Sequence, residues 1–70
     1  MKYVYVIEKA NDGSYSAYVP DLPGCTTSGD SIEEVRQLIG EAVALHIESL
    51  REHNEPVPLP TSMADVVEAA

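Results

Sequence analysis

The apolar residues that follow Ser31 recur at the spacing of one long amphipathic helix, and this feature constrains the fold of the chain most strongly. The recurring positions are Ile32, Val35, Leu38, Ile39, Ala42, Val43, Leu45, Ile47 and Leu50. A helix that runs from Ile32 to about His53 is roughly 33 Å long at 1.5 Å per residue. In a chain of 70 residues, such a helix must cover a second layer built from the remaining residues.

The residues around the predicted helix start are typical of a helix N-terminus. Asp30 or Ser31 can cap the free amides of the first turn, and Glu33 or Glu34 can complete a capping box. Both glutamates also favour the positive end of the helix dipole. Gly40 is the exception, because a glycine inside a helix costs about 1 kcal/mol relative to alanine. We expect Gly40 to admit a close backbone approach from the sheet or from a second subunit.

Three strands are predicted before the helix. Lys2–Glu8 and Ser14–Val19 have strand composition, and Asn11–Gly13 between them is typical of a hairpin turn. The two prolines of Pro20–Gly24 stop the ladder and force a second turn. A short third strand, Cys25–Ser28, can follow. The sequence therefore predicts an α+β fold with a small antiparallel sheet and one covering helix.

The segment after the helix is predicted from its turn and proline residues. Asn54 can adopt the left-handed cap conformation, and Pro56 prevents the helix from continuing. Because Pro58 interrupts it, Val57–Leu59 can form only an edge strand or an extended segment. A last short helix is predicted for Met63–Glu68.

A stable monomer of this size has little core to rely on, because single cores in this range rarely supply more than roughly 3–5 kcal/mol. Cys25 is the only cysteine, so no internal disulfide can form, and no Cys/His spacing suggests a structural zinc. The first strand is also apolar on both faces, which favours a central position or a second subunit on one side. We therefore expect a homodimer or a larger homo-oligomer.

The chain carries 12 acidic and four basic residues, a formal net charge of −8. This charge disfavours direct binding to DNA or RNA and attracts a basic protein partner. The alternative is that the acidity only keeps a small domain soluble. No signal peptide or membrane span is recognisable, and the lone thiol fits a reducing compartment, so we expect a cytoplasmic protein.

No pattern of catalytic or metal-binding residues is recognisable. Cys25 has no base beside it in the sequence and is interpreted as a buried filler. His46 and His53 are seven residues apart, whereas helical zinc sites use a spacing of four. Four carboxylates could in principle gather around Mg²⁺, but turns and caps explain their positions better; they are Glu8, Asp12, Asp21 and Asp30. We predict no enzyme activity and no cofactor.

An ordered set of motifs resembles the HicB-like antitoxin family. The motifs are Gly13 to Tyr15 in the hairpin, the run Pro20-Asp21-Leu22-Pro23-Gly24-Cys25, the step Gly29-Asp30-Ser31, and Glu33-Glu34 at the helix start. They stand in register over about Lys2 to Pro60. The resemblance implies a β-β-β-α-β domain with a degenerate ribonuclease-H-like fold that assembles into dimers or higher oligomers.

The resemblance also implies a partner. Members of the family bind and block HicA, a small basic toxin that cleaves mRNA, and many carry a C-terminal DNA-binding domain. This sequence ends at Ala70 with no such segment, which puts autorepression by this chain alone in doubt. We expect one domain over residues 1–70, with a short helix or tail at 61–70, that neutralises a HicA-type toxin.

Four acidic residues are expected to contribute to partner binding, because turns and helix starts expose their side chains. They are Asp21, Glu33, Glu34 and Glu41. Two alternatives remain open at this point: an orphan structural or ligand-binding domain with an unknown partner, and a remnant metal-dependent nuclease.

Overall fold

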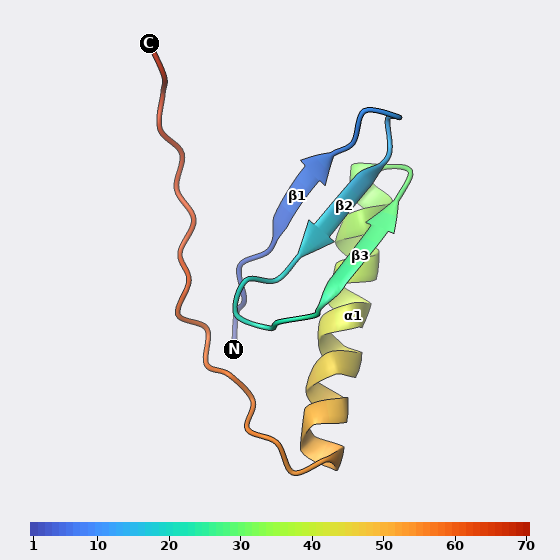
Figure 1. Ribbon diagram of the computed structural model, residues 1–70, viewed down its shortest axis with the longest axis vertical. Helices are drawn as coiled ribbons and strands as arrows, with labels where there is room; N and C mark the ends of the chain where they lie inside the picture. The colour runs from blue at the N-terminus through green and yellow to red at the C-terminus, as the bar shows by residue number, and fades with distance from the viewer.

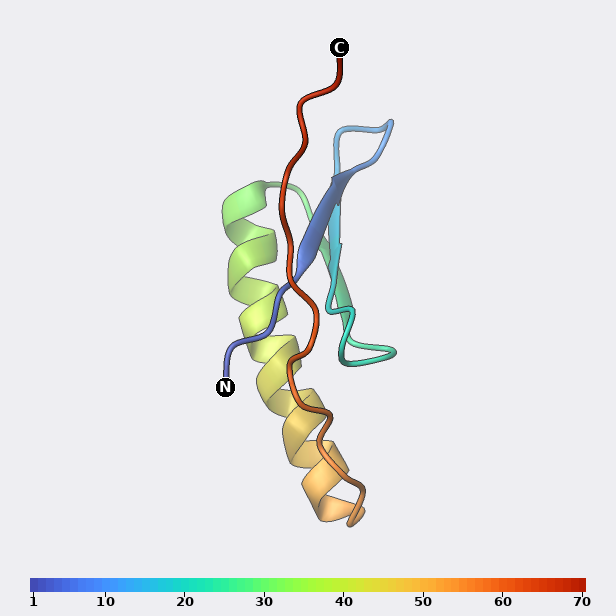
Figure 2. The same cartoon turned by 90° about the vertical axis from the view of Figure 1, so that its left-hand side faces the viewer.

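The computed structural model describes residues 1–70 and contains one three-stranded antiparallel sheet and one helix. The elements are β1 (Val6–Lys9), β2 (Tyr15–Tyr18), β3 (Thr26–Gly29) and α1 (Ile32–Glu52). The strand order is β1-β2-β3, and α1 lies across one face of the sheet while the other face stays open (Figures 1 and 2). The predicted α+β architecture is confirmed. The molecule is a thin slab of 45 × 27 × 16 Å.

The hairpin between β1 and β2 closes through the predicted turn. The Gly13 amide donates to the Ala10 carbonyl at 3.1 Å. Gly13 has a backbone φ of 90°, which residues other than glycine rarely adopt. The Asp12 carboxylate accepts hydrogen bonds from the amide of Ser14 at 2.9 Å and from its hydroxyl at 2.6 Å. These bonds set the register, in which Ile7 lies opposite Ala17.

The second turn brings a leucine into the core. The Cys25 amide donates to the Leu22 carbonyl at 3.0 Å, and the Val19 amide donates to the Cys25 carbonyl at 3.1 Å. Gly24, with a φ of 85°, reverses the chain between them, as the sequence predicts. The side chain of Leu22 is fully buried. This loop therefore fixes the position of β3 and supplies part of the core.

Helix α1 begins and ends close to its predicted limits. The Ser31 hydroxyl accepts a hydrogen bond from the Glu34 amide at 3.1 Å, and the Glu34 carboxylate accepts one from the Asp30 amide at 2.8 Å. These reciprocal bonds form a variant of the capping box that reaches one residue before the cap. At the other end His53 is the cap residue, and Asn54 has the expected positive φ of 56°.

The core lies between the sheet and the N-terminal half of α1. Its six buried residues are Ala17, Val19, Leu22, Cys25, Val35 and Ile39. The C-terminal half of α1 extends beyond the end of the sheet, as Figure 1 shows. It is not covered by any strand. The domain thus has a small apolar centre and a helix that projects from it.

Strand β1 differs from the prediction in length and position. It begins at Val6 rather than at Lys2. It lies at the edge of the sheet, so the central position is excluded, and the alternative of a second subunit on one face stays a prediction. Tyr3 and Ile7 pack against the core, whereas Val6 lies on the open face, paired with Tyr18. Gly40 also differs from expectation: a Cβ at this position would meet no atom within 4 Å, so the sheet does not explain this glycine.

The chain after α1 forms no further helix or strand. Of the two alternatives for Val57–Leu59, the edge strand is not formed, because Pro56, Pro58 and Pro60 remove the backbone donors that a ladder needs, and the segment makes no ladder hydrogen bond. The predicted helix at Met63–Glu68 is also wrong. So short a helix is marginal unless its apolar face packs on the domain, and this segment is exposed. The alternative of a C-terminal tail is the one that the structure contains.

The two glycine environments predict opposite effects on stability. Gly24→Ala should lower the free energy of unfolding by about 1–2 kcal/mol, because alanine is strained at positive φ. Gly40→Ala should raise it by about 0.5–1 kcal/mol, because the helix gains propensity and the new methyl group meets open space. Denaturant unfolding of both variants measures these changes. A Gly40→Ala variant that is less stable than the parent would mean that another molecule packs closely there.

Candidate protein-interaction surface

Cys25 is a residue of the core. Its side chain is buried beside β2 and α1, in the cluster that includes Val35 and Ile39. Burial raises the pKa of the Cys25 thiol above its usual range, which lowers the thiolate fraction that nucleophilic attack requires. The interpretation of Cys25 as a buried filler is confirmed.

The titratable side chains do not gather into a metal centre. Nowhere in residues 1–70 do three or more His, Cys, Asp or Glu side chains come together in a way that could hold a metal ion. His53 uses its Nδ1 atom locally, at 2.8 Å from the Ser49 carbonyl one turn earlier. The hypothesis of a remnant nuclease therefore gains no support from the carboxylate positions.

Asp21 holds the C-terminal tail against the domain. Its carboxylate accepts hydrogen bonds from the amide and hydroxyl of Thr61 at 3.0 and 3.1 Å, and from those of Ser62 at 2.9 and 2.8 Å. The amide of Ser62, followed by its hydroxyl, holds the pKa of the Asp21 carboxyl below its usual range. The Tyr3 hydroxyl also donates a hydrogen bond to the Pro58 carbonyl, which holds a second point of the tail. The tail is thereby fixed as far as Ser62.

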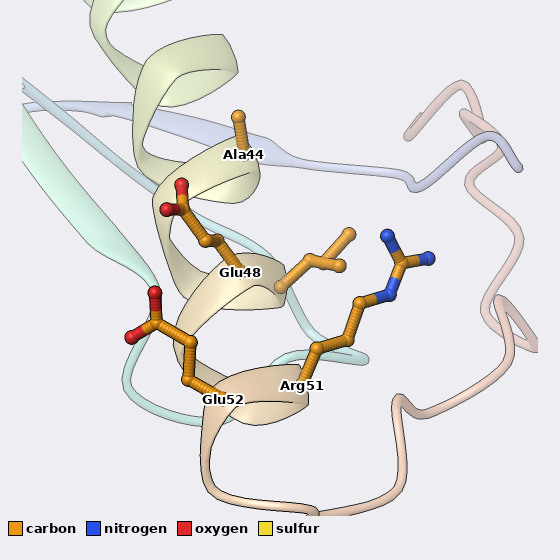
Figure 3. A pocket seen from close by; sticks show the side chains of 5 residues that line it. Ala44, Glu48, Arg51 and Glu52 are labelled. Atoms are coloured by element: carbon orange, nitrogen blue, oxygen red, sulfur yellow. The ribbon is translucent and has the colours of Figure 1, made fainter.

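A row of glutamates follows one side of α1. Glu34, Glu41 and Glu48 are seven residues apart, which places them two helical turns apart on nearly the same side, and all three are exposed. Glu52 follows Glu48 one turn later. In Figure 3, Glu48 and Glu52 point to one side of α1, and Arg51 points to the other. We call these four glutamates the acidic row.

Apolar surface lies beside the acidic row. Leu45 belongs to the apolar positions of α1, yet 66% of its surface is exposed, whereas Ile47, two residues later, packs against the core. Leu45 therefore lies to the side of the face that meets the sheet. Near it, an open hollow of about 640 Å³ lies along the projecting half of the helix; its lining residues are Ala44, Ile47, Glu48, Arg51 and Glu52 (Figure 3). The projecting half of α1 thus combines carboxylates with exposed apolar surface.

The four predicted site residues do not form one cluster. Glu33 and Glu34 lie at the start of α1, and Glu41 lies near its middle. Asp21 lies in the segment that joins β2 to β3, and this segment and the start of α1 are at opposite ends of the sheet (Figure 1). Glu33 lines a second, smaller hollow between the helix start and the hairpin, in which the Lys9 ammonium lies 6.0 Å from the centre of the Tyr15 ring.

The sequence reasoning missed two features of this surface. Glu48 extends the line of Glu34 and Glu41, and its seven-residue spacing was a usable signal. The exposure of Leu45 is the second feature: Leu45 lies ten residues after Val35 and six after Ile39, which places it to the side of the buried face of α1. Separately, no part of α1 is long and apolar enough to cross a membrane.

Comparison with known proteins gives a consistent family assignment. The family model for the HicB-like antitoxin of bacterial toxin–antitoxin systems matches residues 3–70. A UPF0150 protein of Thermoplasma acidophilum is 48% identical over 58 residues, which are 83% of this chain and 84% of that protein. Antitoxin HicB 1 of Photorhabdus laumondii is 35% identical over 60 residues, and the match spans 86% of this chain and 39% of that longer protein.

A solved structure agrees with the fold described above. The crystal structure of the N-terminal domain of Burkholderia pseudomallei antitoxin HicB superposes with a TM-score of 0.74 at 30% sequence identity. The match covers 84% of this chain and 69% of that one.

The tail anchor is predicted to depend on pH. Because the folded-state pKa of Asp21 is lowered, the anchor is fully present above the ordinary aspartate pKa of about 3.9 and is lost as the pH falls through the lowered value. The amide chemical shifts of Thr61 and Ser62 should follow this titration with a midpoint below about 3.9, as measured by nuclear magnetic resonance.

A matched control is available in the hairpin. The pKa of Asp12 is also lowered, first by the Ser14 hydroxyl and then by the Ser14 amide. Asp21→Asn should abolish the titration at Thr61 and Ser62, whereas Asp12→Asn should leave it unchanged. Tail amides that titrate identically in all three proteins would contradict the anchor.

Proposed function

This chain belongs to the HicB-like antitoxin family, and from that premise we propose that it binds a small basic toxin of the HicA type and blocks the toxin's nucleic-acid surface. In this proposal the protein acts by binding alone, without chemistry of its own, in the cytoplasm where mRNA is present. It does not contact nucleic acid directly. The observation that carries the proposal is the acidic row beside exposed apolar surface on the projecting half of α1.

The net charge supports a basic partner. With 12 acidic and four basic residues, the chain repels the phosphate backbone and attracts a protein that binds it. Carboxylates arranged along a rigid helix can take the place of phosphates in front of basic side chains. Charge complementarity of this kind speeds association and rejects partners of the wrong sign.

The arrangement of charged and apolar groups supports a protein rather than a small ligand as partner. Leu45 offers an accessible apolar anchor, and Glu41 and Glu48 lie within one turn of it along the same helix. Protein interfaces typically combine a desolvated apolar centre with a polar rim. We therefore place the centre of the proposed interface at Leu45 and its rim on the acidic row.

The four residues expected from the sequence take different parts in this proposal. Glu41 belongs to the rim, and Glu34 contributes only as far as its cap to the Asp30 amide leaves its carboxylate free. Glu33 lies in the first turn of α1, at the margin of the proposed interface. Asp21 acts indirectly, because its carboxylate already accepts four hydrogen bonds from the tail.

Charge reversal on the acidic row is predicted to slow toxin binding. Against a HicA-type protein, Glu41→Lys with Glu48→Lys should lower the association rate constant by about tenfold at low salt. The difference from the parent should shrink as salt rises, because the Debye length falls from about 10 Å at 0.1 M to about 3 Å at 1 M. Leu45→Ala should act mainly on the dissociation rate. Surface plasmon resonance with the toxin immobilised measures both constants.

The control for net charge is Glu8→Lys with Glu55→Lys, which makes the same change of charge away from the acidic row. If both double variants slow association equally, only the total charge matters and the proposed interface is wrong. If no basic protein binds to the parent chain, the alternative of an orphan domain with an unknown partner is favoured.

A further inference from the structure

The acidic row of α1 is part of a longer seam with the spacing of a coiled coil. Two leucines, Leu38 and Leu45, stand between the glutamates, so that the seam reads Glu34, Leu38, Glu41, Leu45, Glu48 and Glu52. The spacings alternate between four and three residues, which is the a/d pattern by which two helices pack side by side. We call these six residues the exposed seam.

The sheet leaves the exposed seam uncovered. Leu45 is 66% exposed, and Leu38 is half-buried but is not among the residues that pack against the core. The buried face of α1, with Val35 and Ile39, lies on another side of the helix. The carboxylate of Glu34 already accepts a hydrogen bond from the cap. The free part of the seam therefore runs from residue 38 to residue 52, about 21 Å along the helix axis.

The composition of the exposed seam defines the chemistry of its partner. Leucines stand at its a positions 38 and 45, glutamates stand at its d positions, and no basic residue lies in it. A second copy of this chain would bring further carboxylates to the seam and no cation, which is unfavourable. A surface that presents apolar side chains to the leucines and lysine or arginine to the glutamates satisfies both sets.

The repeat distance of the seam identifies a helix as the matching element. Glu41 and Glu48 are seven residues apart, which is about 10.5 Å along the axis. A second helix repeats its side chains at the same distance in every heptad. A β-strand repeats one face about every 6.6–6.8 Å, so its side chains lose the match after one repeat.

We propose that the exposed seam docks one basic amphipathic helix of the partner protein, packed along residues 38–52 of α1. This inference rests on the proposed function and adds the kind of element that the acidic row receives. Helices with this spacing cross at about 20°. The docked helix therefore follows α1 onto the half that projects beyond the sheet, where Glu48 and Glu52 point to one side (Figures 1 and 3).

Three synthetic peptides test the spacing with the full chain. All have three heptads and the same numbers of leucine, lysine and alanine residues. One has leucine at a and lysine at d and matches the seam in a parallel orientation; the second has the reverse order and matches it antiparallel; the third has no heptad spacing. At low salt, one of the first two should bind at least about tenfold more tightly than the third, as measured by fluorescence anisotropy.

Leucine variants locate the apolar part of the contact. Leu45→Ala should weaken binding of the matched peptide at least about fivefold. The control, Leu59→Ala, makes the same change at a 71% exposed site in the tail and should leave binding unchanged. Circular dichroism near 222 nm should be the same for both variants and the parent, because both side chains lie outside the core.

Glutamine variants locate the charged part. Glu41→Gln with Glu48→Gln should weaken binding of the matched peptide about threefold at low salt and less at 1 M salt. Glu8→Gln with Glu55→Gln removes the same charge away from the exposed seam and should have a smaller effect. Equal losses in the two double variants overturn the proposal, because total charge would then explain the binding.

The peptide order separates this inference from the proposed function. Three peptides that bind equally, or none that binds, overturn the docked helix, even where a HicA-type toxin binds the chain. A chain that binds the matched peptide through the exposed seam but no HicA-type toxin supports the docked helix and contradicts the proposed toxin.

Discussion

The fold depends on one constraint: the apolar stripe of a long helix must be buried by a sheet with only three short strands. Val35 and Ile39 meet Ala17 from the central strand, but strands of four residues leave this layer incomplete. The turn between β2 and β3 completes it by inserting Leu22, and Cys25 follows on the other side of the turn. The proline-rich segment is therefore part of the core as well as a connection.

Local signals in the sequence predicted most of the fold because each acts over a few residues. The helix starts after Ser31, and both predicted turn glycines, Gly13 and Gly24, have positive φ, since caps and turns are set by neighbouring atoms. The edge position of β1 and the anchoring of the tail by Asp21 were not predictable in this way. The hydrogen bonds of Asp21 span about forty residues, and no local pattern marks their partners.

The candidate surface was predicted in part for the same reason. Exposure of Glu33 and Glu41 follows from the amphipathic pattern of α1, which a single sequence contains. The apolar positions also included Leu45, which is exposed, although Ile47 two residues later packs against the core. The error is informative, because an apolar side chain beside the buried face of the helix is available to another molecule. Glu34, in turn, has the structural task at the helix start that the capping-box pattern predicted for Glu33 or Glu34.

The slab is only 16 Å thick, and six of its 70 residues are buried. A protein so thin has almost no interior to protect, so substitutions at most positions alter what a partner meets without disturbing how the chain folds. Recognition and folding are then encoded by nearly separate sets of residues. A lineage that duplicates such a domain can change its partner through surface substitutions alone, with the same scaffold kept by a few core positions and two turn glycines.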